Sequence, residues 1–413
     1  SWKGKLIGMK ILKRVTAVLL TAVVAVSFTA CGGRSEHAKK LNIDTAVSIN
    51  IWYQDDAYTS YLDYIAQQFH KANEFITVNP VKVEENNLLD AVYNGSIAQN
   101  NVADVYLMEA SDMQRAYLMG LTAENDAYTQ YYSQKHFPVT AVNAACYEGK
   151  LYGYPVTFHT AVMVYNKKYA TAPENFEQIE AFLNSYQVTD ENKDVNMIVG
   201  WDTQDLWTNY AFGGSYVDNG GAQGEDAESD AQTEALKAAM TEYAALQNTF
   251  GIVDKTQEEY KQMFINNQLI YTILDSTQLA DLNASGVDYG ICAVPGAKTG
   301  FGTQSLSDTI LAMVNPYSEN TDTAKAVAQA ISYDYADLLE KDTGYISART
   351  DVADKNKKTL YQPLYEVYAK SDSYAKYIGA DEFYVRYSIL LHNIWKGEDL
   401  NESVDAFIKA VSR

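Results

Sequence analysis

The alternation of two hydrophobic periods between residues 46 and 111 restricts the fold of this chain more than any other feature of its sequence. Three segments there, AVSINIWYQDD, ITVNPVKVEE and VADVYLMEAS, are rich in β-branched and aromatic residues and are typical of strands. Between them, YTSYLDYIAQQFHKAN and LLDAVYNGSIAQNN repeat apolar residues at helical spacing. This order predicts parallel strands joined by right-handed crossovers, and hence an α/β fold. In such sheets ligands bind beyond the carboxyl ends of the strands.

The length and the charge of the chain limit its class further. With 413 residues, 47% of them hydrophobic, the chain is too long for one ordinary core and predicts two lobes. The formal net charge of −21 repels phosphate backbones, which argues against nucleic acid as a partner. The sequence contains no G-x-S-x-G motif and no P-loop.

The amino-terminal segment has the pattern of an export signal. From Met9 the sequence MKILKRVTAVLLTAVVAVSFTAC has a basic start, an apolar run too short for a comfortable membrane span, and small residues before Cys31. It resembles a bacterial lipoprotein signal, with ordinary secretory cleavage nearby as the alternative. We therefore expect a signal peptide over 1–30 that starts at Met9, lipidation of Cys31, and a polar tether over 31–41 that holds the protein at the membrane.

The remaining cysteines and the histidines predict neither a disulfide nor a metal site. Cys146 and Cys292 have apolar neighbours that suit buried free thiols. The sequence has five histidines, scattered and without CxxC or HxxxH spacing. We expect no metal and no cofactor.

Several segments, in this order along the chain, resemble a known family. They are INIWYQDD, NVADVYLMEAS, YEGKLYGYPVTFHTAVMVYNKKYA, PENFEQIEAF, MFINNQLIYTI, DYGICAVPG and WKGEDLNESVDAF. Together with the lipoprotein signal they resemble the extracellular solute-binding lipoproteins of ABC importers, in the maltose-binding-like group.

The resemblance implies a type II periplasmic-binding-protein fold. Two lobes, each a mixed and mainly parallel sheet flanked by helices, would be joined by a hinge and close on a ligand. One lobe is expected from 42–157 plus 300–341 and the other from 160–295 plus 345–413. The segment from Tyr147 to Ala170 would be the crossover between them.

Candidate ligand contacts follow from the strand-end rule and from the resemblance. In the first lobe they are Trp52, Asp55, Asp56, Glu109 and Ser111, and His159 lies at the crossover. In the second lobe they are Trp201, Asp202, Trp207, Asp275, Ser276, Tyr384 and Arg386. Rings would stack on a sugar, and carboxylates or the guanidinium would bind its hydroxyls. The segment LDST lies where the family often has Gly-Pro-Trp, so the resemblance supplies no aromatic platform at that place.

The function implied by the resemblance is transport without chemistry. A monomer outside the cytoplasm would capture a sugar or oligosaccharide by hinge closure and deliver it to the permease subunits of an ABC importer. One alternative is another polar solute, such as a sugar acid or a polyamine, because acids such as Asp55, Asp56 and Glu109 could surround a cation. The other is a secreted carbohydrate-active enzyme, which would need a carboxylate pair; the eight-fold strand–helix rhythm of a barrel is absent.

Overall fold

The computed structural model describes residues 41–411 apart from 85, 221–232 and 353–356. The expected signal peptide, the lipidation site at Cys31 and the tether up to residue 40 lie outside the described residues. Within the described part, no helix combines the length and the apolar character needed to cross a bilayer.

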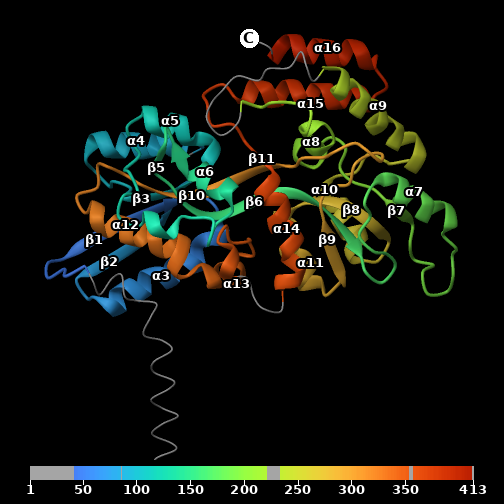
Figure 1. Ribbon diagram of the computed structural model, residues 1–413. Helices are drawn as coiled ribbons and strands as arrows, with labels where there is room; N and C mark the ends of the chain where they lie inside the picture. The colour runs from blue at the N-terminus through green and yellow to red at the C-terminus, as the bar shows by residue number, and fades with distance from the viewer. Residues whose placement is uncertain (1–40, 85, 221–232, 353–356, 412–413) are drawn as a thin grey trace, which may run out of the picture.

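Among the described residues, one nine-stranded sheet runs through both halves of the molecule (Figure 1). Its main path is β2-β1-β3-β10-β6-β8-β7, while β11 pairs with β10 and β9 pairs with β6. The strands are β1 (Val47–Tyr53), β2 (Ile76–Lys82), β3 (Val105–Glu109), β6 (Tyr154–Asn166), β7 (Met197–Val199), β8 (Leu269–Asp275), β9 (Tyr289–Cys292), β10 (Leu306–Val314) and β11 (Asp372–Ser373). A separate hairpin joins β4 (Cys146–Tyr147) to β5 (Lys150–Leu151). The pairs β1–β2 and β1–β3 are parallel, which confirms the prediction from the alternating periods.

The strand β6 connects the two halves of the sheet. Its first part pairs with β10 up to Thr160, and its second part pairs with β8 from Ala161 onward. The expected crossover therefore contains one long strand, and His159 lies one residue before the midpoint of this strand. The exact lobe boundaries given above stay a prediction.

Helices cover both faces of the sheet in the first half. These helices are α3 (Thr59–Ala72), α4 (Leu88–Ala98), α5 (Met113–Leu118), α6 (Val139–Ala145), α12 (Thr321–Gln329) and α13 (Ala336–Thr343). The buried side chains of this half belong to two cores, one of which continues into the second half. Ile51 and Tyr53 pack into the core that includes α3 and α13, whereas Trp52 packs into the opposite one with α4. Successive side chains of a strand point to opposite faces, which separates these neighbours.

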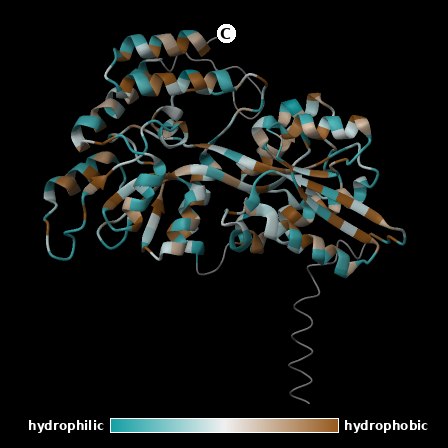
Figure 2. Cartoon of the chain, turned by 180° about the vertical axis from the view of Figure 1, so that it is seen from behind, coloured by the Kyte–Doolittle hydropathy of each residue, from teal (hydrophilic) through white to brown (hydrophobic). Residues whose placement is uncertain are grey.

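The second half has an aromatic core. The helices of this half are α7 (Phe176–Ser185), α8 (Leu206–Gly214), α9 (Thr233–Phe250), α10 (Gln257–Ile265), α11 (Leu279–Ser285), α15 (Asp381–Trp395) and α16 (Leu400–Val411). The helix α14 (Lys358–Lys370) lies between the halves, and its Tyr368 ring stacks on Phe158 of β6 at 3.8 Å between centroids. Figure 2 shows hydrophobic residues along the central strands and both hydrophobic and hydrophilic residues along the peripheral helices, as expected for helices that bury one face. Cys146 and Cys292 are unpaired thiols.

Candidate functional site

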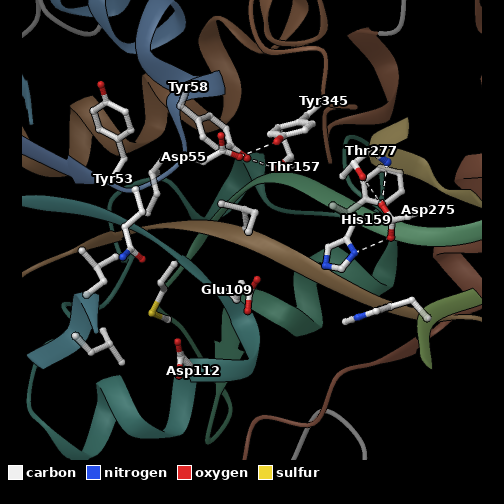
Figure 3. Close-up of a pocket in the computed structure, with 18 of the residues that line it drawn as sticks. Tyr53, Asp55, Tyr58, Glu109, Asp112, Thr157, His159, Asp275, Thr277 and Tyr345 are labelled. Carbon is white, nitrogen blue, oxygen red and sulfur yellow. Dashed lines mark hydrogen bonds and ion pairs between the residues drawn. The ribbon is translucent and has the colours of Figure 1, made fainter. Parts of the chain in front are cut away.

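A cavity of about 700 Å³ lies between the two halves of the molecule (Figure 3). The first half contributes the carboxyl ends of β1 and β3, where Asp55 and Glu109 lie, together with the start of α4. The strand β6 contributes Thr157 and His159. The second half contributes polar and aromatic side chains, namely Trp207, Gln257, Asp275, Thr277 and Gln278. Both halves therefore face one cavity with side chains that hydrogen-bond and stack.

His159 and Asp275 form a fixed pair on one wall. The His159 Nδ1 lies 3.0 Å from the Asp275 Oδ2, and the other carboxylate oxygen accepts hydrogen bonds from the backbone N–H and the hydroxyl of Thr277. The Asp275 backbone N–H donates to Gln257 Oε1 at 3.0 Å. The centroid of the Trp207 ring lies 4.4 Å from that of the His159 imidazole, and the Trp207 ring also stacks on Tyr374. Neighbours thus hold both members of the pair in one orientation.

The electrostatics of this pair favour its charged form. Burial alone would lower the pKa of His159, but the attraction of Asp275 and the hydrogen bond to it outweigh burial and raise the pKa to about 9. Burial would likewise raise the pKa of Asp275, yet the His159 charge and the bonds from Thr277 lower it below its usual value. At neutral pH the wall therefore carries an imidazolium beside a carboxylate.

A second group of carboxyl groups lies around Glu109. Burial and the nearby Glu109 charge raise the pKa of Asp112, which also lines the cavity. The same two causes raise the pKa of Asp308 in β10 to about 7, against an opposing contribution from His159. Among the described residues, the Glu109 carboxylate has neither a hydrogen-bond nor an ion-pair partner. This part of the cavity is negative and can accept hydrogen bonds from a ligand.

Tyrosines line the opposite side of the cavity. The Tyr58 hydroxyl shares a hydrogen bond with Thr157 Oγ1 at 2.6 Å, and the Tyr345 hydroxyl donates to Asp55 Oδ2 at 2.7 Å. Their rings lie 5.7 Å apart, between centroids. Asp55 is held further because its side chain caps the following turn through the Ala57 N–H.

Five of the predicted site residues line the cavity: Asp55, Glu109, His159, Trp207 and Asp275. Three others lie behind it and support it. Ser111 hydrogen-bonds Asp308, the Ser276 hydroxyl accepts from the Thr160 N–H, and the Asp202 carboxylate accepts from the Gln257 N–H.

The other five lie away from the cavity lining. Trp52 and Trp201 are core residues, 6% and 0% exposed, and the Trp201 Nε1–H donates to Asn209. Tyr384 is buried and stacked on Tyr374. Asp56 pairs with Lys82 and Arg386 with Glu382, both at the surface. The expectation that these five side chains contact the ligand does not fit these positions, because packing or surface pairing already accounts for each one.

The sequence did not predict several of the residues that line the cavity. Tyr53 and Tyr58 flank the predicted Asp55, so the same strand-end rule could have found them. Gln257 follows a helix cap, and Tyr345 follows Gly344, whose φ of 78° ends α13. No local pattern marks these last two residues as facing a cavity. Among the residues described, no cluster of three or more His, Cys, Asp or Glu side chains is arranged to hold a metal ion.

The comparisons with known proteins agree with this architecture. Residues 64–363 match the model of a family described as bacterial extracellular solute-binding proteins. The chain belongs to this family.

Individual relatives support the same assignment. The maltodextrin-binding protein MdxE of Bacillus subtilis (strain 168) is 22% identical over 308 residues, which are 71% of this chain and 70% of that protein. Among solved structures, a cyclo/maltodextrin-binding protein complexed with maltotetraose has a TM-score of 0.73 at 16% identity, covering 90% of this chain and 97% of that one. A Staphylococcus aureus solute-binding protein in complex with maltose has a TM-score of 0.72 at 18% identity, with 89% and 98% covered. These similarities confirm the expected family and the two-lobed binding-protein fold.

Proposed function

We propose that this protein is the substrate-binding component of an ABC importer, and that it captures a sugar or oligosaccharide and delivers it to the permease. One observation carries the proposal: a cavity of about 700 Å³ is lined by hydrogen-bonding side chains from both halves of a solute-binding-family chain. Structures with the same fold are described as bound to maltose or maltotetraose. The cavity volume lies within the range usual for small-molecule sites.

Capture follows from the position of the cavity. A ligand that contacts both Glu109 and Trp207 has more contacts when the halves approach each other than when they separate. It therefore shifts the population toward the closed arrangement, and no bond needs to be made or broken. The long strand β6 is the element about which the halves would move.

The lining suits a polyhydroxylated ring. Trp207 and Tyr345 offer aromatic faces for stacking, while Asp55, Glu109 and Gln257 offer groups that hydrogen-bond hydroxyls. The proposal includes lipidation at Cys31, a monomeric state and permease partners, which rest on the sequence pattern and on the family.

The charge balance of the cavity favours a second candidate, a cationic solute such as a polyamine. Arg115 pairs with Asp90, and His159 pairs with Asp275. The charges of these two cations reach Asp112 and Glu109, but each cation is already paired with another carboxylate. An amine placed there would relieve the repulsion between the two carboxyl groups.

A thermal-shift screen separates these candidates. We expect maltose, maltotriose or maltotetraose to raise the Tm by mass action and to be recovered unchanged. A shift with spermidine alone would support the cationic solute, and a shift with galacturonate alone would support a sugar acid. Consumption of the sugar in the same tube would contradict the transport function.

A matched pair of variants tests the location of the site. Trp207→Ala removes a cavity side chain and is expected to abolish the shift, whereas Tyr317→Ala removes a ring that is 44% exposed and does not line the cavity. Equal shifts in both variants would show that the ligand binds elsewhere.

A further inference from the structure

His159 has one ring nitrogen that no described residue engages. Nδ1 faces Asp275, and Figure 3 shows the second nitrogen on the opposite edge of the ring, toward the interior of the cavity. The side chain of His159 is 20% exposed and lines the cavity. The ring cannot turn without losing its hydrogen bond to Asp275 and its packing on Trp207. The Nε2 atom therefore has a fixed direction.

The chemical character of Nε2 depends on one proton. A neutral ring that donates from Nδ1 to Asp275 presents Nε2 as an acceptor, whereas an imidazolium presents it as a donor. The partner of Nδ1 therefore determines what kind of ligand atom the cavity can bind at this point.

We propose that Asp275 is a positioning residue that holds His159 as an imidazolium, so that Nε2–H is donated to an acceptor oxygen of the bound saccharide. The identity of the ligand in this inference rests on the proposed function, whereas the protonation state of the ring does not. Asp275 suits the role because its carboxylate is engaged on both oxygens, by His159 on one and Thr277 on the other.

The other charged groups that face His159 also stabilise its imidazolium form. They are Asp308 in β10, which is its pairing partner in the sheet, and Glu109 at the end of β3. Both are carboxyl groups, and together with Asp275 they outweigh the cost of burying the cation. A hydrogen bond from a charged donor is roughly twice as strong as one between neutral groups.

The state of the ring can be measured without any ligand. The full chain is labelled with ¹³C and ¹⁵N at its five histidines, and the His159 signal is assigned by its loss in His159→Gln. We expect His159 to titrate near pH 9 in the wild type and at least about one pH unit lower in Asp275→Asn, toward the ordinary value of about 6.5. The matched control is Asp288→Asn, which removes one carboxylate whose side chain is 77% exposed and leaves the His159 titration unchanged. Titration near pH 6.5 in the wild type would overturn the proposal.

Donation to the ligand is tested by calorimetry with maltotetraose as the probe. Affinity is expected to fall about tenfold or more between pH 8 and pH 10, because the donor becomes an acceptor. In Asp275→Asn the fall moves to lower pH, while Asp288→Asn follows the wild type. Equal affinity at pH 7 and pH 10 overturns the donor role. If His159 titrates near pH 9 but maltotetraose binds at neither pH, the saccharide function fails, and with it donation to a saccharide.

Discussion

Trp201 and Trp207 lie on either side of the start of α8 but occupy opposite environments. Trp201 is fully buried among Phe176, Phe212 and Trp395, whereas Trp207 faces the cavity. Trp201→Ala leaves a large void and removes one of the two hydrogen bonds that Asn209 Oδ1 accepts, so we expect it to lower the free energy of unfolding by about 3–5 kcal/mol.

Urea denaturation with matched ligand titration separates the roles of the two residues. Trp207→Ala is expected to lose ligand binding with a stability cost of about 1 kcal/mol, since its ring is half-buried. If Trp201→Ala folds with wild-type stability and only loses binding, the assignment of Trp201 to the core is wrong.

The pair of His159 and Asp275 also predicts a pH dependence of stability. The folded-state pKa of His159, about 9, lies above the unfolded value of about 6.5. Its contribution is therefore complete below about pH 6.5 and is lost as the pH rises to about 9. The stability difference between wild type and His159→Gln should be about 2–3 kcal/mol smaller at pH 10 than at pH 7.

Chemical denaturation of both proteins at the two pH values measures this difference. Comparing wild type with variant at each pH cancels the titration of groups that do not interact with His159. A difference that is the same at pH 7 and pH 10 would mean that the folded protein does not stabilise the imidazolium.

At the scale of elements, the start of α10 connects a helix cap to the cavity. Thr256 caps the helix in a capping box with Glu259, and the next residue, Gln257, hydrogen-bonds the Asp275 N–H. Thr256→Ala removes the cap and should cost about 1 kcal/mol of stability, measured by urea denaturation. Thr241→Ala, at an exposed site inside α9, is the control and should cost nothing, because alanine is the better helix former. Equal costs in the two variants would contradict the role of the cap.

The strands illustrate how far the sequence alone could predict the site. The alternation of periods was sufficient for the parallel pairing of β1 with β2 and β3, and the strand-end rule found Asp55 and Glu109. The same rule selected Trp52, which does not line the cavity, because the two-residue period of a strand places its side chain on the face opposite Tyr53. Which face meets the cavity depends on the packing of α3 and α4, and no local pattern specifies that.

Other cavity residues depend on contacts between distant parts of the chain. Tyr345 reaches the cavity only because α13 packs beside α3, far from it in sequence. Trp201 and Tyr384 were candidates because aromatic rings suit sugars, but aromatic rings also fill cores, and burial decides between the two uses. The spacing of apolar residues predicts which side chains of a helix or a strand are buried. It makes no such prediction for a loop.

For the whole molecule, Lys376 joins the two halves at a place other than β6. It lies between β11 and α15, is 2% exposed, and its Nζ donates to the carbonyl oxygens of Asn143 at 2.6 Å and Cys146 at 2.5 Å, at the end of α6. The neighbouring Ile378 N–H donates to Gln114 Oε1 in α5 at 2.6 Å. A cation suits the carboxyl end of a helix, whose last carbonyl groups lack partners within the helix.

Lys376→Met keeps the apolar stem but removes the hydrogen bonds that Nζ donates to these carbonyl groups, so we expect a loss of about 1–3 kcal/mol at pH 7. Burial lowers the folded-state pKa of Lys376 to about 8, below the unfolded value of about 10.4. Between these values the unfolded chain binds more protons, so the wild type gains stability as the pH rises, and its advantage over the variant should be larger at pH 9.5 than at pH 7. Lys409→Met, at an exposed site on α16, is the control for urea denaturation at both pH values. A Lys376→Met protein as stable as this control would show that the lysine does not hold the end of α6.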